Sequence, residues 1–350
     1  MASASQSTAS VSFAASEGFA EWLRTEGISL AFTTYQAGKV CLLGTGGTGK
    51  LCLFERSFPR AMGLAVSHDA RALLLAGLYE IHRFDDLLQP GQQDSEGHTA
   101  LYRPNQSWIT GELDVHDLAF DPAGQPLFVA TRFSCLGTVA EGFSFRPIWK
   151  PPFVSAIAPD DRCHLNGMAM YQGRAQYVTL FARSDSAEGW RDRVAGNGLI
   201  LDVESGETVA QGLSMPHSPR LHEDTLYCLN SGTEEFGIVD QGDGSFMAIA
   251  ACPGYARGLA LRKDFAVIGL SLPRAHEGAK PQRNSDDEAR CGIVVLSLSS
   301  GAVLHSLAIE GAIRELYDVA ILPARSPAMI GLRNDDVRYT LSIDASAIGF

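Results

Sequence analysis

Three histidines, His116, His164 and His217, are the residues whose type and spacing are best suited to chemistry. They follow one another at steps of about 50 residues, which is the length of one unit in several repeat folds. Neutral imidazoles bind zinc, copper and iron(II), and three of them leave coordination positions open for water or substrate. The histidines are therefore candidate ligands of a transition metal, provided that the fold brings them together. Because no carboxylate stands among them, copper or iron is favoured, with zinc as the alternative.

Other polar residues occupy similar places in the same repeated pattern, namely Asn166, Arg257, Glu315 and Tyr317. The planar guanidinium of Arg257 is suited to holding a carboxylate or phosphate group of a substrate. Tyr317 or Glu315 could transfer protons, and Asn166 could coordinate the metal or cap a strand. A structural interpretation stays open for all of them. Each histidine could bond a backbone carbonyl, and Arg257 could form an ion pair with Glu315 or Asp318.

The pattern that carries these residues occurs six times, each time at the start of an apolar strand. Its equivalent positions are Gly63, Asp117, Gly167, Pro219, Gly258 and Asp318. Short strands repeated at intervals of roughly 40 to 60 residues are typical of β-propeller blades. Because the innermost strand of each blade lies at the axis, equivalent residues of successive blades converge on one central channel. The sequence thus predicts an all-β, six-bladed propeller with the histidines at its axis.

Both ends of the chain contribute to the predicted ring. The strand-like segments 38–43 and 50–54 come before the first copy of the pattern, whereas few strands follow the last copy near Asp318. A propeller has no open edge between its first and last blades when one blade is built from both termini. We therefore expect N-terminal strands to complete the C-terminal blade.

Three further segments have predicted roles. Residues 1–14 are small and polar and are predicted to form a disordered tail, which leaves 15–350 as a single propeller domain. A short helix over 16–24, capped by Ser16, is expected to cover one end of the ring. The insertion Phe143–Phe153 is rich in aromatic residues and prolines. Since an exposed aromatic run usually covers something, it is predicted to be an ordered flap over the channel.

Composition excludes several classes of partner. The chain has 28 basic and 40 acidic residues and a net charge of −12, which argues against binding to nucleic acid. No apolar run is long enough to cross a membrane, so no membrane association is expected. Its seven cysteines are an odd number and lie mostly within apolar strands, as expected for reduced thiols in the cytoplasm. The oligomeric state is left open.

Several segments together resemble an uncharacterised bacterial family of conserved hypothetical proteins that contain a domain of unknown function. They are 33–39, 60–65, 149–153, 161–167, 213–220 and 315–320. The resemblance extends from about Phe19 to Leu332. It implies a propeller-like fold and no particular activity. One segment, Tyr79–Phe84, departs from the family pattern, so no role is carried over to it.

Three functional hypotheses follow from the sequence. The leading one is a metal-dependent propeller enzyme, with a histidine-bound transition metal in the central channel, that oxidises or reduces a small or peptidic polar substrate. A metal-dependent lyase or hydrolase at the same site is the second. The third is a non-catalytic propeller that binds a protein or peptide partner. A calcium-type ion would instead need the oxygen atoms of Asn166, Asp117, Glu315 and Asp318.

Overall fold

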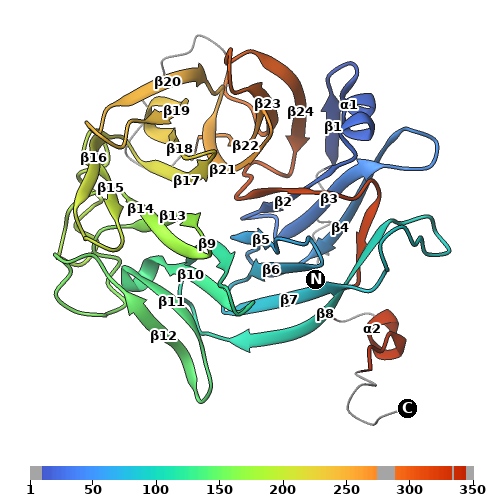
Figure 1. Ribbon diagram of the computed structural model, residues 1–350, viewed down its shortest axis with the longest axis horizontal. Helices are drawn as coiled ribbons and strands as arrows, with labels where there is room; N and C mark the ends of the chain where they lie inside the picture. The colour runs from blue at the N-terminus through green and yellow to red at the C-terminus, as the bar shows by residue number, and fades with distance from the viewer. Residues whose placement is uncertain (1–9, 274–287, 333–334, 344–350) are drawn as a thin grey trace, which may run out of the picture.

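Six β-sheets form a ring around a central axis in the computed structural model, which describes residues 10–273, 288–332 and 335–343 (Figure 1). Each sheet is one blade. With the innermost strand given first, blade 1 consists of β5 (Leu64–Val66), β6 (Ala72–Ala76), β7 (Glu80–Asp86) and β8 (Ala100–Ile109), and blade 2 of β9 (Val115–Phe120), β10 (Pro126–Ala130), β11 (Cys135–Ala140) and β12 (Phe143–Trp149). Blade 3 consists of β13 (Leu165–Tyr171), β14 (Arg174–Leu180), β15 (Gly198–Asp202) and β16 (Thr208–Leu213), and blade 4 of β17 (Pro216–His222), β18 (Thr225–Asn230), β19 (Glu235–Val239) and β20 (Phe246–Ala251). Blade 5 consists of β21 (Tyr255–Arg262), β22 (Phe265–Ser271), β23 (Gly292–Ser297) and β24 (Val303–Gly311), and blade 6 of β25 (Val319–Leu322), β2 (Ser29–Thr34), β3 (Lys39–Thr45) and β4 (Leu51–Ser57). The six inner strands coincide with the six copies of the sequence pattern, which confirms the predicted propeller.

Blade 6 closes the ring with strands from both ends of the chain, as predicted. The C-terminal strand β25 pairs antiparallel with β2, in a register that sets Phe32 opposite Val319. Two further strands extend other blades at their outer edges. β1 (Val11–Ala15) pairs antiparallel with β24 of blade 5, and β26 (Pro327–Met329) runs parallel to β8 of blade 1. These additions cover strand edges that would otherwise be open to pairing with another chain.

The N-terminal segment differs in part from its predicted form. Val11–Ala15 is a strand, so the part of the expected tail from residue 11 onward is ordered, whereas residues 1–9 lie outside the described residues. Helix α1 runs over Phe19–Glu26 and has Gly18 as its N-cap. Ser16 does not cap it. The Ser16 hydroxyl instead accepts a hydrogen bond from the backbone of Ser306 in β24.

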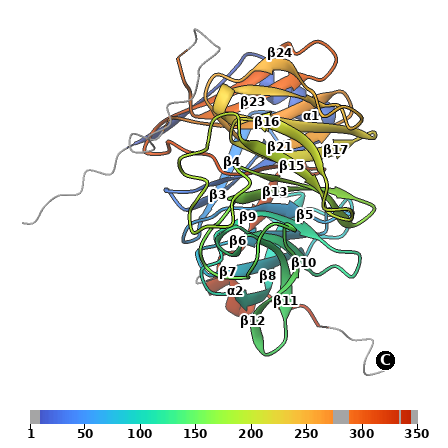
Figure 2. The same cartoon turned by 90° about the vertical axis from the view of Figure 1, so that its left-hand side faces the viewer.

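Helix α1 lies at the rim of the ring beside β1 and does not cover an end of it (Figures 1 and 2). Its buried residues Phe19 and Leu23 pack in one apolar cluster with residues of blades 5 and 6, such as Phe265 and Phe32. The helix therefore fills the wedge between two blades. The other helix is α2 (Asp335–Tyr339), and no helix among the described residues is long and apolar enough to span a membrane.

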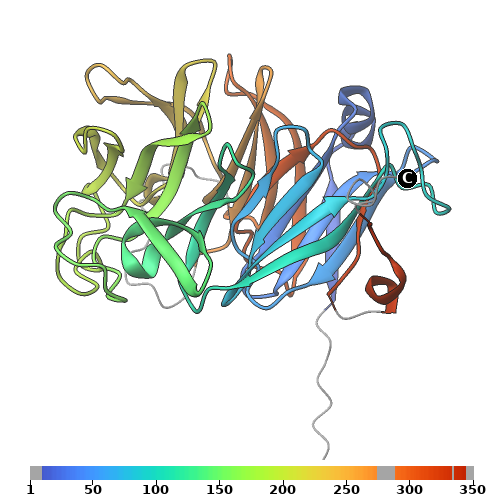
Figure 3. The ribbon, with the colours of Figure 1, turned by 60° about the horizontal axis from the view of Figure 1, so that its bottom comes forward.

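The segment Phe143–Phe153 is not a flap over the channel. Most of it, Phe143–Trp149, is β12, the outermost strand of blade 2, which lies at the rim and far from the axis (Figures 1 and 3). Phe145 packs against Phe133 at a ring-centroid distance of 5.2 Å, whereas Phe143 is 76% exposed. Phe145 and Trp149 are thus half-buried against the blade, whereas Phe143, at the beginning of the strand, is exposed.

Glycine recurs in the pattern because neighbouring inner strands come very close to each other. A Cβ on Gly167 of blade 3 would lie 2.6 Å from the Pro219 ring of blade 4. A Cβ on Gly258 of blade 5 would lie 2.7 Å from Asp318 of blade 6, and Gly258 also has a φ of +74°. Both contacts exclude a side chain. At Gly63 of blade 1 the equivalent distance is an ordinary 3.4 Å.

Charged residues of the even-numbered blades form hydrogen bonds with the backbone of the next blade, and we call these residues clasps. The Asp117 carboxylate of blade 2 accepts a hydrogen bond from the backbone N–H of Met168 in blade 3. Asp318 of blade 6 does the same for Leu64 of blade 1. Arg220 of blade 4 donates to the Leu259 carbonyl of blade 5, and it also pairs with Asp117 at 2.8 Å. Glycines and charged clasps therefore alternate around the axis, which gives the ring a repeat of two blades.

Candidate functional site

The three histidines meet at one end of the channel because the loops that lead into the inner strands bend. Four residues in these loops have positive φ, namely Asp114 (56°), Asp161 (42°), His164 (51°) and Met215 (50°). Residues other than glycine rarely adopt a positive φ, and this backbone conformation turns the chain sharply. The bends bring together histidines that stand at different offsets from the start of their strands. We call this end of the channel, where the inner strands begin, its upper end.

The three histidine rings lie close to one another and are linked by ring contacts. The rings of His116 and His164 lie edge to face, with their centroids 4.9 Å apart. Phe181 stands between His164 and His217, at centroid distances of 4.4 and 5.2 Å. Among the described residues, no group of three or more His, Cys, Asp or Glu side chains is placed to hold a metal ion. The copper, iron or zinc site stays a prediction.

Hydrogen bonds fix which ring nitrogen carries the proton in two of the histidines. His116 Nδ1 lies 2.9 Å from the carbonyl of Asp114 and 2.8 Å from the hydroxyl of Thr131, and that hydroxyl donates its own proton to the carbonyl of Leu165. Both neighbours therefore accept from Nδ1–H. His217 repeats this arrangement in blade 4, since its Nδ1 lies 2.9 Å from the carbonyl of Met215. In each ring Nε2 is left with a lone pair.

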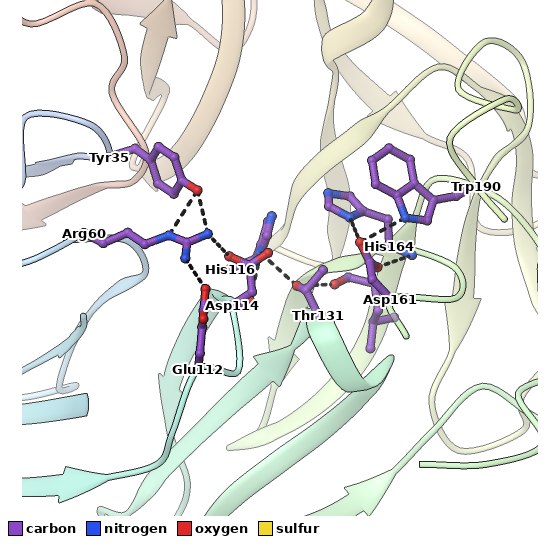
Figure 4. A network of polar contacts seen from close by, with 10 residues as sticks. Tyr35, Arg60, Glu112, Asp114, His116, Thr131, Asp161, His164 and Trp190 are labelled. Carbon is purple, nitrogen blue, oxygen red and sulfur yellow. Dashed lines mark hydrogen bonds and ion pairs between the residues drawn. The ribbon is translucent and has the colours of Figure 1, made fainter. Parts of the chain in front are cut away.

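His164 has a carboxylate partner in place of a hydroxyl (Figure 4). Its Nδ1 lies 2.8 Å from Asp161 Oδ2, and the indole of Trp190 donates to the same oxygen at 2.9 Å. The indole also packs on the imidazole at a centroid distance of 4.2 Å. This pair has the form of a carboxylate that orients a general base, because Asp161 holds the ring and leaves Nε2 as the acceptor.

Burial and charge set the protonation states of these groups. Burial lowers the pKa of His116 to about 4 and, together with the nearby Arg257, holds the pKa of His217 well below its usual value. Burial opposes ionisation of Asp161, but the interactions with His164 and Trp190 outweigh it and lower the pKa of this carboxyl. Two neutral imidazoles and one ionised carboxylate follow at neutral pH.

Arg257 is a buried cation without an ion pair. It is 8% exposed, and its guanidinium lies over the rings of Tyr255 and Tyr317, 4.8 and 5.7 Å from their centroids. No salt bridge or side-chain hydrogen bond joins it to another residue of the described part of the chain, and its Nε is buried without a hydrogen-bond partner there. A buried charge without a counter-charge is unfavourable unless a ligand supplies one.

A cavity of about 10 Å³ lies on the axis next to this guanidinium, and it is lined by His116, Asp117, Asn166, His217, Ser218, Arg220, Arg257, Tyr317 and Asp318. Three of the lining residues have a buried polar atom without a hydrogen-bond partner among the described residues, namely Asn166 Nδ2, His217 Nε2 and Arg257 Nε. The fold thus gathers most of the predicted site residues around one space. His164, whose ring is edge to face with that of His116, and the buried Glu315 are outside this lining.

Three of the four residues that a calcium-type ion would need, Asp117, Asp318 and Asn166, already use side-chain oxygens in hydrogen bonds. Asp117 and Asp318 accept backbone N–H groups, and Asn166 Oδ1 accepts from the hydroxyl of Thr179 at 2.7 Å. Burial raises the pKa of Asp318 to about 7, although Arg220 opposes the shift. These residues are therefore clasps of the ring.

Sequence reasoning missed several residues of the upper end. Tyr35 packs on Tyr317 at a centroid distance of 5.6 Å, and its hydroxyl accepts from Arg60, which pairs with Asp114 (Figure 4). Trp190 comes from the long connection between β14 and β15. This connection carries no copy of the repeated pattern, so nothing in the sequence placed it at the axis.

A second cavity of about 1000 Å³ opens at the lower end of the channel, where the inner strands finish. Its walls are mostly apolar side chains of those strands, such as Leu118, Met170 and Ile321. Asp117 and Arg220 line both cavities, so their ion pair stands between the two.

Comparison with solved structures supports the fold alone. A chain in the crystal structure of a nidogen/laminin complex has a TM-score of 0.54 at 12% identity and covers 84% of this chain and 98% of its own length. Two proteins of unknown function, from Bacteroides caccae and Desulfotomaculum acetoxidans, cover the same shares with TM-scores of 0.48 and 0.46 at 10% and 11% identity.

The family comparison is the more specific of the two. No match is found among curated proteins. Residues 17–330, nearly all of the propeller, match the family described as Domain of unknown function (DUF4915), in agreement with the resemblance drawn from the sequence. The chain belongs to this family.

Proposed function

We propose that the protein is an enzyme that binds a small molecule with an anionic group at the upper end of the channel. The observation that carries this proposal is the buried guanidinium of Arg257, which forms no salt bridge with a described residue and whose Nε has no hydrogen-bond partner among them. Its place over Tyr255 and Tyr317 holds the planar fork in one orientation, which suits bidentate binding of a carboxylate or similar group.

The chemistry that fits this site is proton transfer. His164, oriented by Asp161 and Trp190, has the partners of a general base, and the carboxylate stabilises the imidazolium that forms when Nε2 takes up a proton. The rings of His116 and His217 are neutral, so they offer polar contacts but add no positive charge that would compete with Arg257 for the anionic group. A hydrolysis or elimination reaction uses such a base, with Arg257 holding the substrate in place.

The test is a binding and turnover screen with small carboxylates and phosphate esters. Isothermal titration would compare the wild type with Arg257→Met and with Arg24→Met, which removes an exposed charge at the rim. We expect Arg257→Met to weaken binding of an anionic ligand by about 100-fold, since a charge-assisted bidentate contact is lost. Arg24→Met should bind as the wild type does. Equal affinity in the two variants would overturn the proposal.

A metal-dependent enzyme, either an oxidoreductase or a lyase or hydrolase, is the second candidate. One observation favours it: Nδ1 of each of the three histidines is bonded to oxygen, which leaves Nε2 available in the way that metal-bound histidines are held. Elemental mass spectrometry on protein purified without a histidine tag tests it. Stoichiometric metal that is lost in both His164→Ala and His217→Ala supports this candidate, and protein that stays metal-free after supplementation contradicts it.

A further inference from the structure

A serine, a histidine and a carboxylate are aligned on blade 1, away from the lining of the axial cavity. His82 in β7 and Ser107 in β8 stand opposite each other in the antiparallel register, and Ser107 Oγ lies 2.8 Å from His82 Nδ1. At the other ring nitrogen, His82 Nε2 lies 3.1 Å from Glu80 Oε2. Glu80 comes two residues before His82 in the same strand, so the two side chains share one face of the blade. The segment Tyr79–Phe84, to which the family resemblance gave no role, thus supplies two of the three groups.

These two contacts fix the direction of each hydrogen bond. A carboxylate accepts hydrogen bonds and does not donate them, so the imidazole proton is on Nε2, where it faces Glu80. The opposite tautomer would set the lone pair of Nε2 against the carboxylate. Nδ1 is therefore the acceptor, and the Ser107 hydroxyl donates its proton to it. This is the bonding of a serine, histidine and carboxylate triad, with the two ring nitrogens in exchanged places.

Burial differs along this chain of groups in the way that a nucleophile and its base require. His82 is 2% exposed, and its ring packs near Phe58 and Phe84 at centroid distances of 5.7 and 6.3 Å. Burial lowers the pKa of His82, although Glu80 opposes the shift, so the ring is neutral and can take up a proton at neutral pH. Ser107, in contrast, is exposed on β8, and β26 pairs only with the beginning of that strand. A reagent in solution thus meets the serine, while its base is shielded from water.

We propose that Ser107 is a nucleophile that accepts acyl groups from small activated esters, with His82 as its general base and Glu80 as the residue that positions the base. Because Ser107 is exposed on a strand, the donor that suits it is small and has a leaving group that departs readily, as in an aryl ester. Ser107 does not line the axial cavity, so this activity would be additional to the one proposed there.

The acylation step balances without any further reactant. Ser107 Oγ forms a bond to the carbonyl carbon of the ester while the hydroxyl proton passes to His82 Nδ1. The bond from that carbon to the leaving oxygen then breaks, and the departing alcohol takes the proton from Nδ1. The products are an acyl-serine, the free alcohol and a neutral histidine. Glu80 stabilises the imidazolium that exists between the two proton transfers.

A fluorophosphonate probe tests the nucleophile in wild-type protein, because it reacts covalently with activated serines. The matched control lies in the same molecule. Ser144 in β12 is also exposed on the outermost strand of a blade, but it has no hydrogen bond to a histidine among the described residues. Peptide mapping by mass spectrometry should find Ser107 labelled about 100-fold faster than Ser144, which is the lower end of what a positioned general base contributes. Equal labelling of the two serines would overturn the proposal.

Variants then assign the role of each group. Ser107→Ala should lose the adduct, and Ser144→Ala should keep it. Glu80→Gln should slow the labelling of Ser107 by about 10-fold or more, because the amide can donate to Nε2 and so move the ring proton to Nδ1. Glu80→Asp retains a carboxylate and should recover part of the rate. Wild-type labelling in Glu80→Gln would contradict the positioning role, since a merely structural Glu80 would change stability alone.

Two further measurements address the base and the acyl donor. His82→Phe fits the aromatic surroundings and should reduce labelling of Ser107 to the level of Ser144; circular dichroism checks that it folds, and Glu80→Gln decides the matter if it does not. Wild-type protein should release nitrophenolate from p-nitrophenyl acetate faster than Ser107→Ala does. Equal release by the two proteins would rule out an activated ester as the donor.

Discussion

At the scale of single residues, the two arginines of the axis, Arg220 and Arg257, are in opposite situations. Arg220 pairs with Asp117 and donates to backbone carbonyls, and these charges raise its pKa even though burial lowers it. Arg257 packs on the rings of Tyr255 and Tyr317 and forms no salt bridge with a described residue. A residue kept for binding is often unfavourable for stability in the free protein, whereas a structural residue is favourable. Stability measurements can therefore tell the two roles apart.

We predict that Arg257→Met makes the free protein more stable, by about 1–2 kcal/mol, because it removes a buried charge that lacks a partner. The matched change Arg220→Met should destabilise the fold by about 3–5 kcal/mol, since it leaves Asp117 buried and unpaired. Urea unfolding followed by fluorescence measures both. A loss of stability in Arg257→Met as large as that in Arg220→Met would contradict the assignment of Arg257 to ligand binding.

The protonation of His116 makes a second residue-scale prediction. Burial lowers the pKa of this group from 6.5 to about 4 in the folded protein, so between these values the unfolded chain binds a proton that the folded chain does not. The free energy of unfolding should fall as the pH drops from 6.5 to 4, by roughly 3 kcal/mol for this group. Asp318, with its pKa raised to about 7, has the opposite effect over an overlapping range.

The variant His116→Asn isolates the histidine, since it retains Asp318 and a donor where Nδ1 stood. Unfolding curves at several pH values should show a smaller loss of stability in the variant than in the wild type between pH 6.5 and 4. Parallel curves for the two proteins would show that His116 is not held neutral by the fold.

At the scale of elements, the sequence predicted where the inner strands begin but not how their loops turn. Repeated apolar strands identify the blades, because strand periodicity survives substitution of individual residues. The bends at Asp161, His164 and Met215 depend on positive φ at residues that are not glycine, for which the sequence has no signal. For the same reason the histidines could be assigned to the axis, whereas the contacts between their rings could not be predicted.

The aromatic segment of blade 2 shows a limit of reasoning from composition. Phe143–Phe153 was predicted to be a flap because its residues are large and apolar, but β12 is an edge strand with Phe143 exposed and Phe145 packed on the blade. The segment that does reach the axis contains Trp190 and Phe181, within a polar stretch. Contacts between distant parts of the chain decide which of the two covers the site.

Close packing of inner strands gives an element-scale prediction. Gly167→Ala should destabilise the fold by about 1–3 kcal/mol, because the new methyl group would overlap the Pro219 ring of the next blade. Gly63→Ala is the control, since its methyl group would make only ordinary contacts with Asp117. Thermal unfolding of the two variants side by side measures the difference. Equal midpoints would mean that the glycine pattern has no steric cause.

At the scale of the whole molecule, closure of the ring depends on a strand pair between the two ends of the chain. The sequence predicted this closure, because the N-terminal strands lacked an inner strand and the last inner strand lacked outer ones. Ala320 in β25 pairs with Ala31 in β2. Every blade packs on two neighbours through the ring, so opening it at one place exposes apolar surface on both sides.

We predict that Ala320→Pro destabilises the whole protein by about 3 kcal/mol or more, since it removes a donor and distorts the closing strand. Ala14→Pro in β1 is the matched change in a strand that lies outside the closed ring. Hydrogen exchange should show loss of protection in all blades for Ala320→Pro, but only near β24 for Ala14→Pro. Local loss in both variants would indicate that closure is not what makes the ring cooperative.

The ion pair of Asp117 and Arg220 separates the two cavities, so the channel is closed between its upper and lower ends. A ligand of the axial cavity is then expected to enter and leave by the upper end of the channel, where Trp190 packs on His164. The residence time of a ligand at the axis then depends on how often this entrance opens, independently of how strongly Arg257 attracts the ligand. Substitutions at this entrance should raise the association and dissociation rates of the ligand together and leave the equilibrium constant nearly the same.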